Sequence, residues 1–461
     1  MIELATVHLP RFGVEAHLPG LSVEEYRSRL EGMQTRMGEA ALDVLVVYAD
    51  REHAANLEFL TGFDPRFEEA LFLLDRHGGR RLLVGNECLG YLPDERLGIG
   101  AELIQDLSLL GQPRESSRPL RRVLAEYGIG RGTRVGCAGW KYFGASLGEP
   151  SREALDVPAY LVDVLRDLTG DRALVTNATA LFMHPATGAR IVNSANQIAR
   201  FEYAAIRTSE AIRTAVERIA PGVEEQTLER HFYPGGLPLS CHAMASFGAK
   251  ARRGLSSPSG RAAQLGDAFT MAFGLTGALT CRAGTVASDA VDLPSDLRDF
   301  YPTFARNYFD VVATWYEHVR VGARGGDVFA AVDATRDPAL FQFAVNPGHY
   351  IHLDEWVHSP FSRGSDIALP SGAAVQMDII PVSCGPFCTI NAEDGIALAD
   401  EALRAECAAR FPAMWSRISA RRAFMMHTLG ITLDQSVLPL SNTAGWLAPY
   451  ALAPTRAFVK R

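Results

Sequence analysis

The sequence has no excess of basic residues, no long apolar run and few cysteines. Its 45 Lys and Arg residues are outnumbered by 53 Asp and Glu residues, which gives a formal net charge of −8. This balance argues against a nucleic-acid-binding protein, because such proteins present a basic surface to the phosphate backbone. An apolar fraction of 48% argues equally against a disordered chain. The seven cysteines, an odd number in 461 residues, do not fit the disulfide framework of a small secreted domain.

No segment has the pattern of a targeting or membrane-spanning sequence. Charged residues near the start, among them Glu3, Arg11 and Glu15, interrupt the apolar core that a signal peptide requires. The longest apolar stretches, 44–49 and 70–74, are far shorter than the roughly 20 residues that a membrane helix needs. We therefore expect a cytoplasmic protein with reduced thiols and no membrane partner.

The N-terminal part of the chain alternates helix and strand signals. Ser22 and Glu25 form a capping box ahead of apolar residues at helical spacing. Predicted strands lie at 44–48, 70–74, 81–84 and 134–137, with a helix at 120–127 and a hairpin between the second and third strands. The length allows two to four domains of about 150 residues each. Because this alternation ends near residue 190, we place an α/β domain at 1–190.

The second part of the chain opens with another capping box and then becomes rich in strands. Ser194 and Gln197 precede a predicted helix that Pro221-Gly222 ends. Further elements are expected as strands at 268–273, 279–286 and 374–380 and as helices at 401–411 and 417–429. The residues after 435 contain several prolines and are predicted to be irregular. No internal repeat is present, and the fold class is α/β (α+β) with a second domain at 191–461.

Three of the 12 histidines lie between Gly348 and His358. In an extended segment, strand alternation places His349 and His352 on opposite faces. A polar loop with buried histidines explains this cluster as well as a reactive site does.

Two acidic positions lie in apolar surroundings further along the chain. Asp378 shares a strand face with Gln376, and Glu393 precedes Asp394 in a second apolar segment. A buried carboxylate needs a partner or a metal. One histidine with two carboxylates can hold a divalent metal, or it can perform acid–base chemistry without one.

These motifs resemble those of the pita-bread superfamily of creatinase, aminopeptidase P, prolidase and methionine aminopeptidase. Segment 42–64, which includes Leu60-Thr61-Gly62-Phe63, is similar to the creatinase-type N-terminal domain, and segment 193–430 is similar to the catalytic domain. The resemblance implies a creatinase-like α/β domain followed by a pita-bread catalytic domain. It also implies a homodimeric enzyme with a small-molecule substrate.

The metal peptidases of this superfamily bind two ions with two Asp, one His and two Glu. The resemblance assigns the histidine of the Gly-His motif to His349, the first glutamate to Asp378 and the last to Glu393. Both aspartate positions are alanine here, Ala272 and Ala283. Because a dinuclear site needs bridging carboxylates, we expect no two-metal site and no cofactor. A single divalent metal held by the three retained residues is the alternative.

The resemblance to metal-free creatinase is also partial. Creatinase-like enzymes carry a histidine where this chain has Leu255, and an acidic residue where it has Thr285. Neither the peptidase set nor the creatinase set is therefore complete.

Five further residues are candidates for the site. Cys281 is predicted on the site face of its strand, either as a nucleophile or as a small buried residue. Arg282 is a candidate for binding a substrate carboxylate, and His352 is a second substrate-binding candidate. His358 resembles the superfamily's second, substrate-contacting histidine, displaced by a two-residue insertion. Arg66 resembles an arginine that creatinase-like dimers lend across the subunit interface, with a plain surface charge as the alternative.

The preferred interpretation is an enzyme that hydrolyses a C–N bond of a small molecule or performs lyase chemistry. His349 would shuttle a proton, and Asp378 and Glu393 would orient it or bind a cationic substrate group. A metal-dependent Xaa-Pro peptidase with an unusual site and a non-catalytic small-molecule-binding protein are the alternatives.

Overall fold

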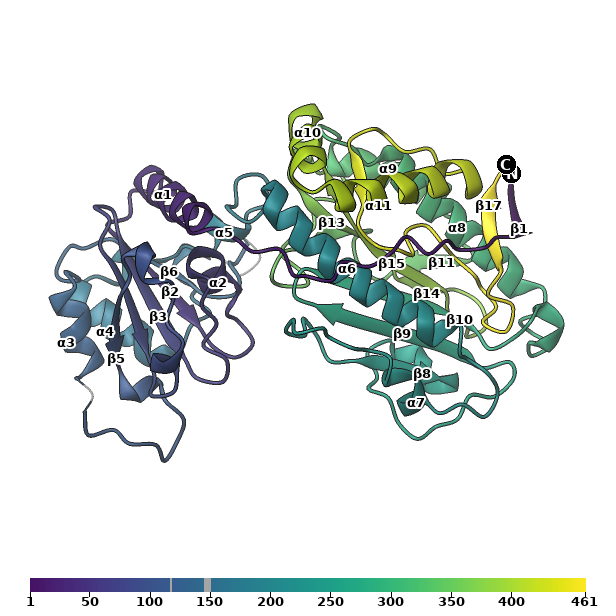
Figure 1. Cartoon of the computed structure of the whole chain (residues 1–461). Helices are drawn as coiled ribbons and strands as arrows, with labels where there is room; N and C mark the ends of the chain where they lie inside the picture. The colour runs from purple at the N-terminus through teal and green to yellow at the C-terminus, as the bar shows by residue number, and fades with distance from the viewer. Residues whose placement is uncertain (117, 145–150) are drawn as a thin grey trace. The chain divides into compact units, whose positions relative to one another are not determined.

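The computed structural model describes residues 1–116, 118–144 and 151–461 (Figure 1). Two compact units divide this chain: Leu21–Arg190, and Met1–Gly20 together with Ile191–Arg461. We expected the whole of 1–190 in the first domain, but the first 20 residues cluster with the C-terminal unit. The reason is a two-stranded antiparallel pairing of β1 (Ile2–Thr6) with β17 (Arg456–Lys460).

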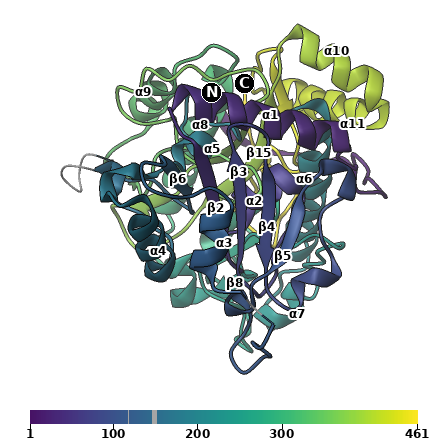
Figure 2. The same ribbon diagram turned by 90° about the vertical axis from the view of Figure 1, so that its left-hand side faces the viewer.

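The unit of residues 21–190 is built on a six-stranded mixed sheet. Its order is β5 (Gly100–Leu103), β4 (Arg80–Val84), β3 (Ala70–Asp75), β2 (Val44–Ala49), β6 (Val135–Ala138) and β7 (Val175–Asn177). Its helices are α1 (Val23–Glu39), α2 (Ala55–Thr61), α3 (Leu120–Glu126), α4 (Ala159–Thr169) and α5 (Ala180–Met183). Helices α3 and α4 lie side by side and bury their apolar residues against the sheet (Figure 2). The β3–β4 hairpin and the Ser22 cap are confirmed.

The second unit is built on a seven-stranded antiparallel sheet. Its main order is β12 (His349–Tyr350), β13 (Ala374–Asp378), β15 (Asn391–Leu398), β10 (Ala278–Thr285), β9 (Ala268–Leu275) and β8 (Met244–Phe247), and β16 (Val437–Pro439) pairs with β15. A separate ribbon joins β11 (Phe341–Phe343) to β14 (Pro381–Ser383). The helices are α6 (Ala195–Val216), α7 (Glu225–Glu229), α8 (Phe300–His318), α9 (Gly325–Thr335), α10 (Glu401–Arg410) and α11 (Pro412–Ala423).

Every residue of β9, β10, β13 and β15 is buried. Helix α6 runs along β9 and β10 (Figure 1), and its N-terminus is capped by the Ser194 hydroxyl as predicted. Because both faces of the sheet are covered, each polar side chain in these strands needs a partner inside the protein. The polar residues of these strands are therefore the place to look for a site.

One prediction for the C-terminal part was wrong and another was confirmed. The residues after 435 are not simply irregular, because they contain β16 and β17. The helix expected at 417–429 is α11, which continues as a π-helical turn over Phe424–Thr428. No helix among the described residues is long and apolar enough to cross a bilayer.

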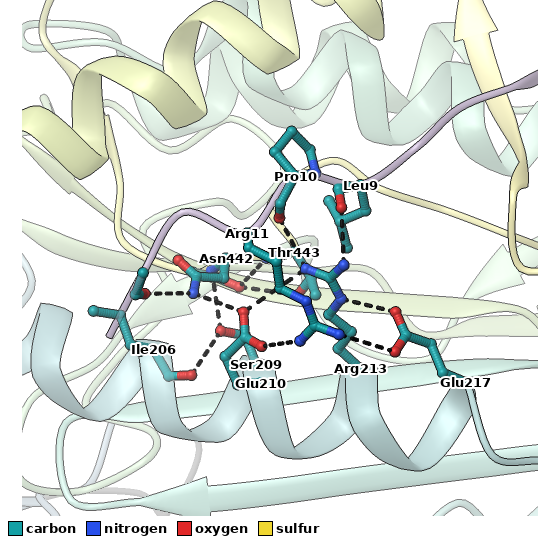
Figure 3. A network of polar contacts seen from close by, with 12 residues as sticks. Leu9, Pro10, Arg11, Ile206, Ser209, Glu210, Arg213, Glu217, Asn442 and Thr443 are labelled. Carbon is teal, nitrogen blue, oxygen red and sulfur yellow. Dashed lines mark hydrogen bonds and ion pairs between the residues drawn. The ribbon is translucent and has the colours of Figure 1, made fainter. Parts of the chain in front are cut away.

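The N-terminal segment is fastened to α6 by a network of polar contacts (Figure 3). The Arg213 guanidinium donates hydrogen bonds of 2.8 Å to the carbonyl oxygens of Leu9 and Pro10. It also pairs with Glu217 at 2.9 Å. The Asn442 side chain reaches Glu210 at 2.8 Å, so the C-terminal segment is fastened to the same helix.

We expect Arg213→Met to lower the free energy of unfolding by about 2–4 kcal/mol, because the change leaves two carbonyl groups without their donor and removes the shorter of the two ion pairs of Glu217. The Arg213 side chain is only 6% exposed, so water cannot fully replace it. Urea denaturation measures the effect. Arg121→Met is the control, because its pair with Asp167 is solvent-exposed and should contribute less than about 1 kcal/mol. Equal losses in both variants would contradict the assignment.

Candidate active site

The strand register brings four side chains into one row across the sheet. Asp378 on β13 lies opposite Glu393 on β15. Glu393 lies opposite Cys281 on β10, which in turn lies opposite Ala272 on β9. Directly opposed residues share a face of the sheet, so the row carries two buried carboxyl groups, a thiol and a methyl group.

His349 joins this row from the edge strand β12. It lies opposite Gln376, which is two residues before Asp378 and therefore on the same face of β13. Gln376 Nε2 lies 3.3 Å from Glu393 Oε1. The preceding Gly348 has a φ of +105°, and a Cβ there would lie 2.7 Å from the Gln376 carbonyl oxygen. The Gly-His motif thus reflects how closely β12 approaches β13.

The His349 ring is fully buried and faces three carboxyl groups. Its Nε2 lies 3.2 Å from Glu355 Oε1, 3.7 Å from Glu393 Oε1 and 3.9 Å from Asp378 Oδ2. Its Nδ1 lies 3.2 Å from the Tyr350 carbonyl oxygen, which favours a proton on that nitrogen. Burial alone would lower the pKa of His349, but the carboxylates outweigh it and hold the pKa well above the usual value. The neighbouring carboxylates thus favour the charged form of the ring.

The three carboxyl groups differ in protonation. Burial raises the pKa of Asp378 to about 7, although the His349 cation opposes the shift. Burial and the neighbouring Asp378 raise the pKa of Glu393 well above its usual value. Burial would also raise the pKa of Glu355, but the pairing with His349 outweighs it and lowers that pKa. The cluster thus holds both an ionised carboxylate and a proton that can be transferred.

The same residues fit one divalent metal ion but not two. One ligand atom each from His349, Asp378 and Glu393 lies within 4.8 Å of the others. Asp378 Oδ1 is buried and has no hydrogen-bond partner among the described residues, which is consistent with a missing cation. The resemblance assigns the two absent aspartates to Ala272 and Ala283, and the structure buries both of these residues.

Glu355 and Trp356 are site residues that the sequence patterns did not single out. They lie in the loop after the Gly-His motif, between β12 and His358. Glu355 makes the shortest carboxylate contact to His349. The Trp356 ring stacks on the His349 ring at a centroid distance of 4.1 Å and an interplanar angle of 19°. Their place in a histidine-rich polar segment was the available signal, but periodicity does not show which side chains of a loop turn inward.

Cys281 lies in the row of site residues, in surroundings that disfavour the thiolate. Asn391 Nδ2 lies 3.3 Å from its sulfur. Burial and the neighbouring Glu393 raise the pKa of the Cys281 thiol well above its usual value. A nucleophilic cysteine needs the opposite shift, because the thiolate is the reactive form. The small buried residue is therefore the interpretation that the geometry favours.

Arg282 faces away from the site, which contradicts the expectation that it binds a substrate carboxylate. Its Nη2 forms a 2.8 Å ion pair with Asp394, and its Nε donates to the Trp446 carbonyl oxygen at 3.1 Å. Asp394 also accepts hydrogen bonds from Ser441 and Thr443. Since Arg282 follows Cys281 in a strand, alternation turns its side chain to the other face.

The structure places the three remaining candidate residues in different surroundings. His352 is fully buried, with its ring edge-on to Phe201 at 5.3 Å. His358 is half-buried and its carbonyl oxygen accepts a hydrogen bond from the Tyr350 amide, which holds it beside β12. Arg66 lies in the unit of residues 21–190, with a φ of +62° and a side chain that is 64% exposed.

The sequence matches no family model and no curated protein. Solved structures do resemble the chain. A prolidase from Thermococcus sibiricus superposes with a TM-score of 0.64 at 15% identity, covering 83% of this chain and 96% of that one. A prolidase from Pyrococcus horikoshii OT3 gives 0.60 at 13% identity, with coverages of 81% and 95%. The Pseudomonas aeruginosa aminopeptidase PepP gives 0.57 at 15% identity, with coverages of 85% and 100%.

Identities this low establish the fold and leave the activity open. The similarity extends over both units, since each comparison covers more than 80% of this chain. The protein therefore has the two-part architecture and pita-bread fold of the prolidases and aminopeptidase P, as the resemblance implies.

Proposed function

We propose that the protein is a hydrolase that cleaves a C–N bond of a small molecule by proton transfer through His349, without a metal pair. One observation carries this proposal: the His349 Nε2 lies within 3.9 Å of three carboxyl groups. The alanines at 272 and 283, where the resemblance expects the two aspartates of a metal pair, support it. Such a cluster supports acid–base chemistry, because its members are poised to exchange protons.

We assign the role of each residue in this reaction from the charge that its surroundings favour. The protonated His349 would donate a proton to the nitrogen that leaves as an amine. Glu355 would stabilise the imidazolium, and Asp378, whose pKa is raised to about 7, would accept a proton from the attacking water. Gln376, hydrogen-bonded to Glu393, would fix the orientation of that carboxyl group. In such a reaction the C–N bond breaks and water supplies the C–O bond, so no oxidant or reductant is needed.

A single divalent metal ion is a second possibility that the donor set favours. Such an ion, held by His349, Asp378 and Glu393, would supply Lewis-acid polarisation of the substrate or of a water molecule. The chain's own residues would still have to provide the proton for the leaving group. Glu355 is outside this ligand set and would remain available for that role.

We also propose that the protein forms a homodimer in which Arg66 contributes to substrate binding. The exposed side chain and the left-handed backbone of Arg66 support a role beyond a surface charge, because such strain persists where a residue's position is needed. Sedimentation velocity tests the dimer, and a purely monomeric protein would refute it.

A turnover screen tests the catalytic proposal. Amides, amidino compounds and Xaa-Pro dipeptides are incubated with the protein in excess EDTA and followed by proton NMR. Turnover of an amide or amidino compound in EDTA, lost in His349→Ala, supports the proposal. Turnover that occurs only with Xaa-Pro dipeptides and added metal would favour the metallopeptidase instead.

A further inference from the structure

A second feature beside the site is an open cavity of about 550 Å³. Its walls combine three aromatic rings with polar and charged side chains from α9, β11 and the loops that follow. The lining residues include Phe329, Asp333, Arg336, Phe343, Trp356 and Arg363. Neither the strand register nor the acid–base cluster accounts for it.

Trp356 links the cavity to the acid–base cluster. One part of its side chain lines the cavity, and its ring stacks on the ring of His349 at 4.1 Å. Trp356 is 37% exposed, whereas His349 is fully buried. The Trp356 indole ring therefore lies between a molecule in the cavity and the proposed proton donor, His349.

The charges of the cavity favour an anion. Asp333 forms ion pairs of 2.7 Å with both Arg336 and Arg363, so two guanidinium groups share one carboxylate. These three side chains leave a net charge of +1 on the wall. The Nε of Arg336 is buried and has no hydrogen-bond partner in the part of the chain that the structure describes.

The aromatic rings hold the two guanidinium groups in place. Arg363 lies over the Phe329 ring at 5.0 Å, and Arg336 lies over the Phe343 ring at 5.1 Å. The Arg363 side chain is nevertheless 76% exposed, so its donors are accessible to a ligand. A guanidinium held in this way binds a carboxylate well, because little side-chain entropy remains to be lost.

We propose that this cavity is the substrate-recognition subsite, that it binds a planar organic carboxylate, and that Arg363 recognises the carboxylate group. The flat body of the ligand would lie among Phe329, Phe343 and Trp356, with its other end directed toward Trp356 and His349. The inference rests on the proposed function and adds the substrate class to it: a C–N compound that carries a carboxylate on a planar group.

Benzoate and benzamide form a matched pair of probes, because they share one shape and differ in charge. Isothermal titration calorimetry with the full chain should show benzoate binding about tenfold more tightly than benzamide. Arg363→Gln should abolish that preference by weakening benzoate about tenfold. Arg121→Gln, which removes an exposed guanidinium paired with Asp167 in the other unit, should leave it unchanged.

The subsite proposal and the proposed reaction can be refuted independently of each other. Benzoate binding that His349→Ala retains and Arg363→Gln loses supports the subsite, even if no turnover is found. Equal affinity for benzoate and benzamide, or benzoate binding unchanged in Arg363→Gln, would overturn the subsite and leave the role of His349 untouched. Failure of both probes to bind at millimolar concentration would overturn it as well.

Discussion

Replacing His349 with alanine should lower kcat at least about 100-fold, since a positioned general acid or base contributes about 10²–10⁴ in rate. The ring pairs with all three carboxyl groups described above, and its loss removes the cation that Glu355, Asp378 and Glu393 share. The measurement is the turnover rate, in excess EDTA, of a substrate that the screen identifies.

The protein must remain folded for this result to count. A lower urea midpoint is expected, because the buried ring is stacked on Trp356 and paired with carboxylates, so activity is compared under conditions in which the variant is folded. Cys281→Ala is the matched control within the same row of the sheet, and it should retain most of the activity. Full activity in His349→Ala, or complete loss in Cys281→Ala, would contradict the assigned roles.

Arg282→Met should lower the free energy of unfolding by about 3–5 kcal/mol, because breaking a buried ion pair leaves an uncompensated charge. The side chains of Arg282 and Asp394 are 3% and 0% exposed, so water cannot solvate the carboxylate that remains. The lost hydrogen bonds to the Trp446 and Thr443 carbonyl oxygens add to the penalty. Urea denaturation followed by circular dichroism measures it.

The matched control is Arg172→Met. Arg172 pairs with Glu153 at 2.7 Å, close to the 2.8 Å of the Arg282–Asp394 pair, but the Arg172 side chain is 65% exposed. Its effect should stay below about 1 kcal/mol. If Arg282→Met were as stable as the wild type and instead lost substrate affinity, the original expectation that Arg282 binds substrate would be restored.

Much of the architecture could be predicted from local patterns. Ser22 and Ser194 each accept a hydrogen bond from the amide three residues later, as the capping boxes predict. Helix α8 was missed for a physical reason. Its buried residues Tyr301, Phe304 and Tyr308 recur at helical spacing and were available as a signal, but residues 311–316 form a continuous buried run that periodicity alone does not assign to a helix.

The candidate site was predicted only in part. The resemblance supplied His349, Asp378 and Glu393, and the structure brings these three together. Glu355 and Trp356 belong to an irregular loop, where no periodicity specifies which side chain turns inward. Their contacts to His349 arise from tertiary packing.

Arg282 shows the opposite case, in which the sequence carried the answer. Adjacent residues of a strand point to opposite faces. Cys281 and Arg282 could not both have faced the site, and the structure turns Arg282 toward Asp394.

The number of metal ions bound per chain tests the central claim most directly. The protein is dialysed with Mn²⁺, Zn²⁺ or Co²⁺, freed of unbound metal, and analysed by mass spectrometry for metal content. Because Ala272 and Ala283 supply no bridging carboxylate, we predict at most one ion per chain, with turnover retained in EDTA. Two ions per chain, together with activity that EDTA abolishes, would contradict the account.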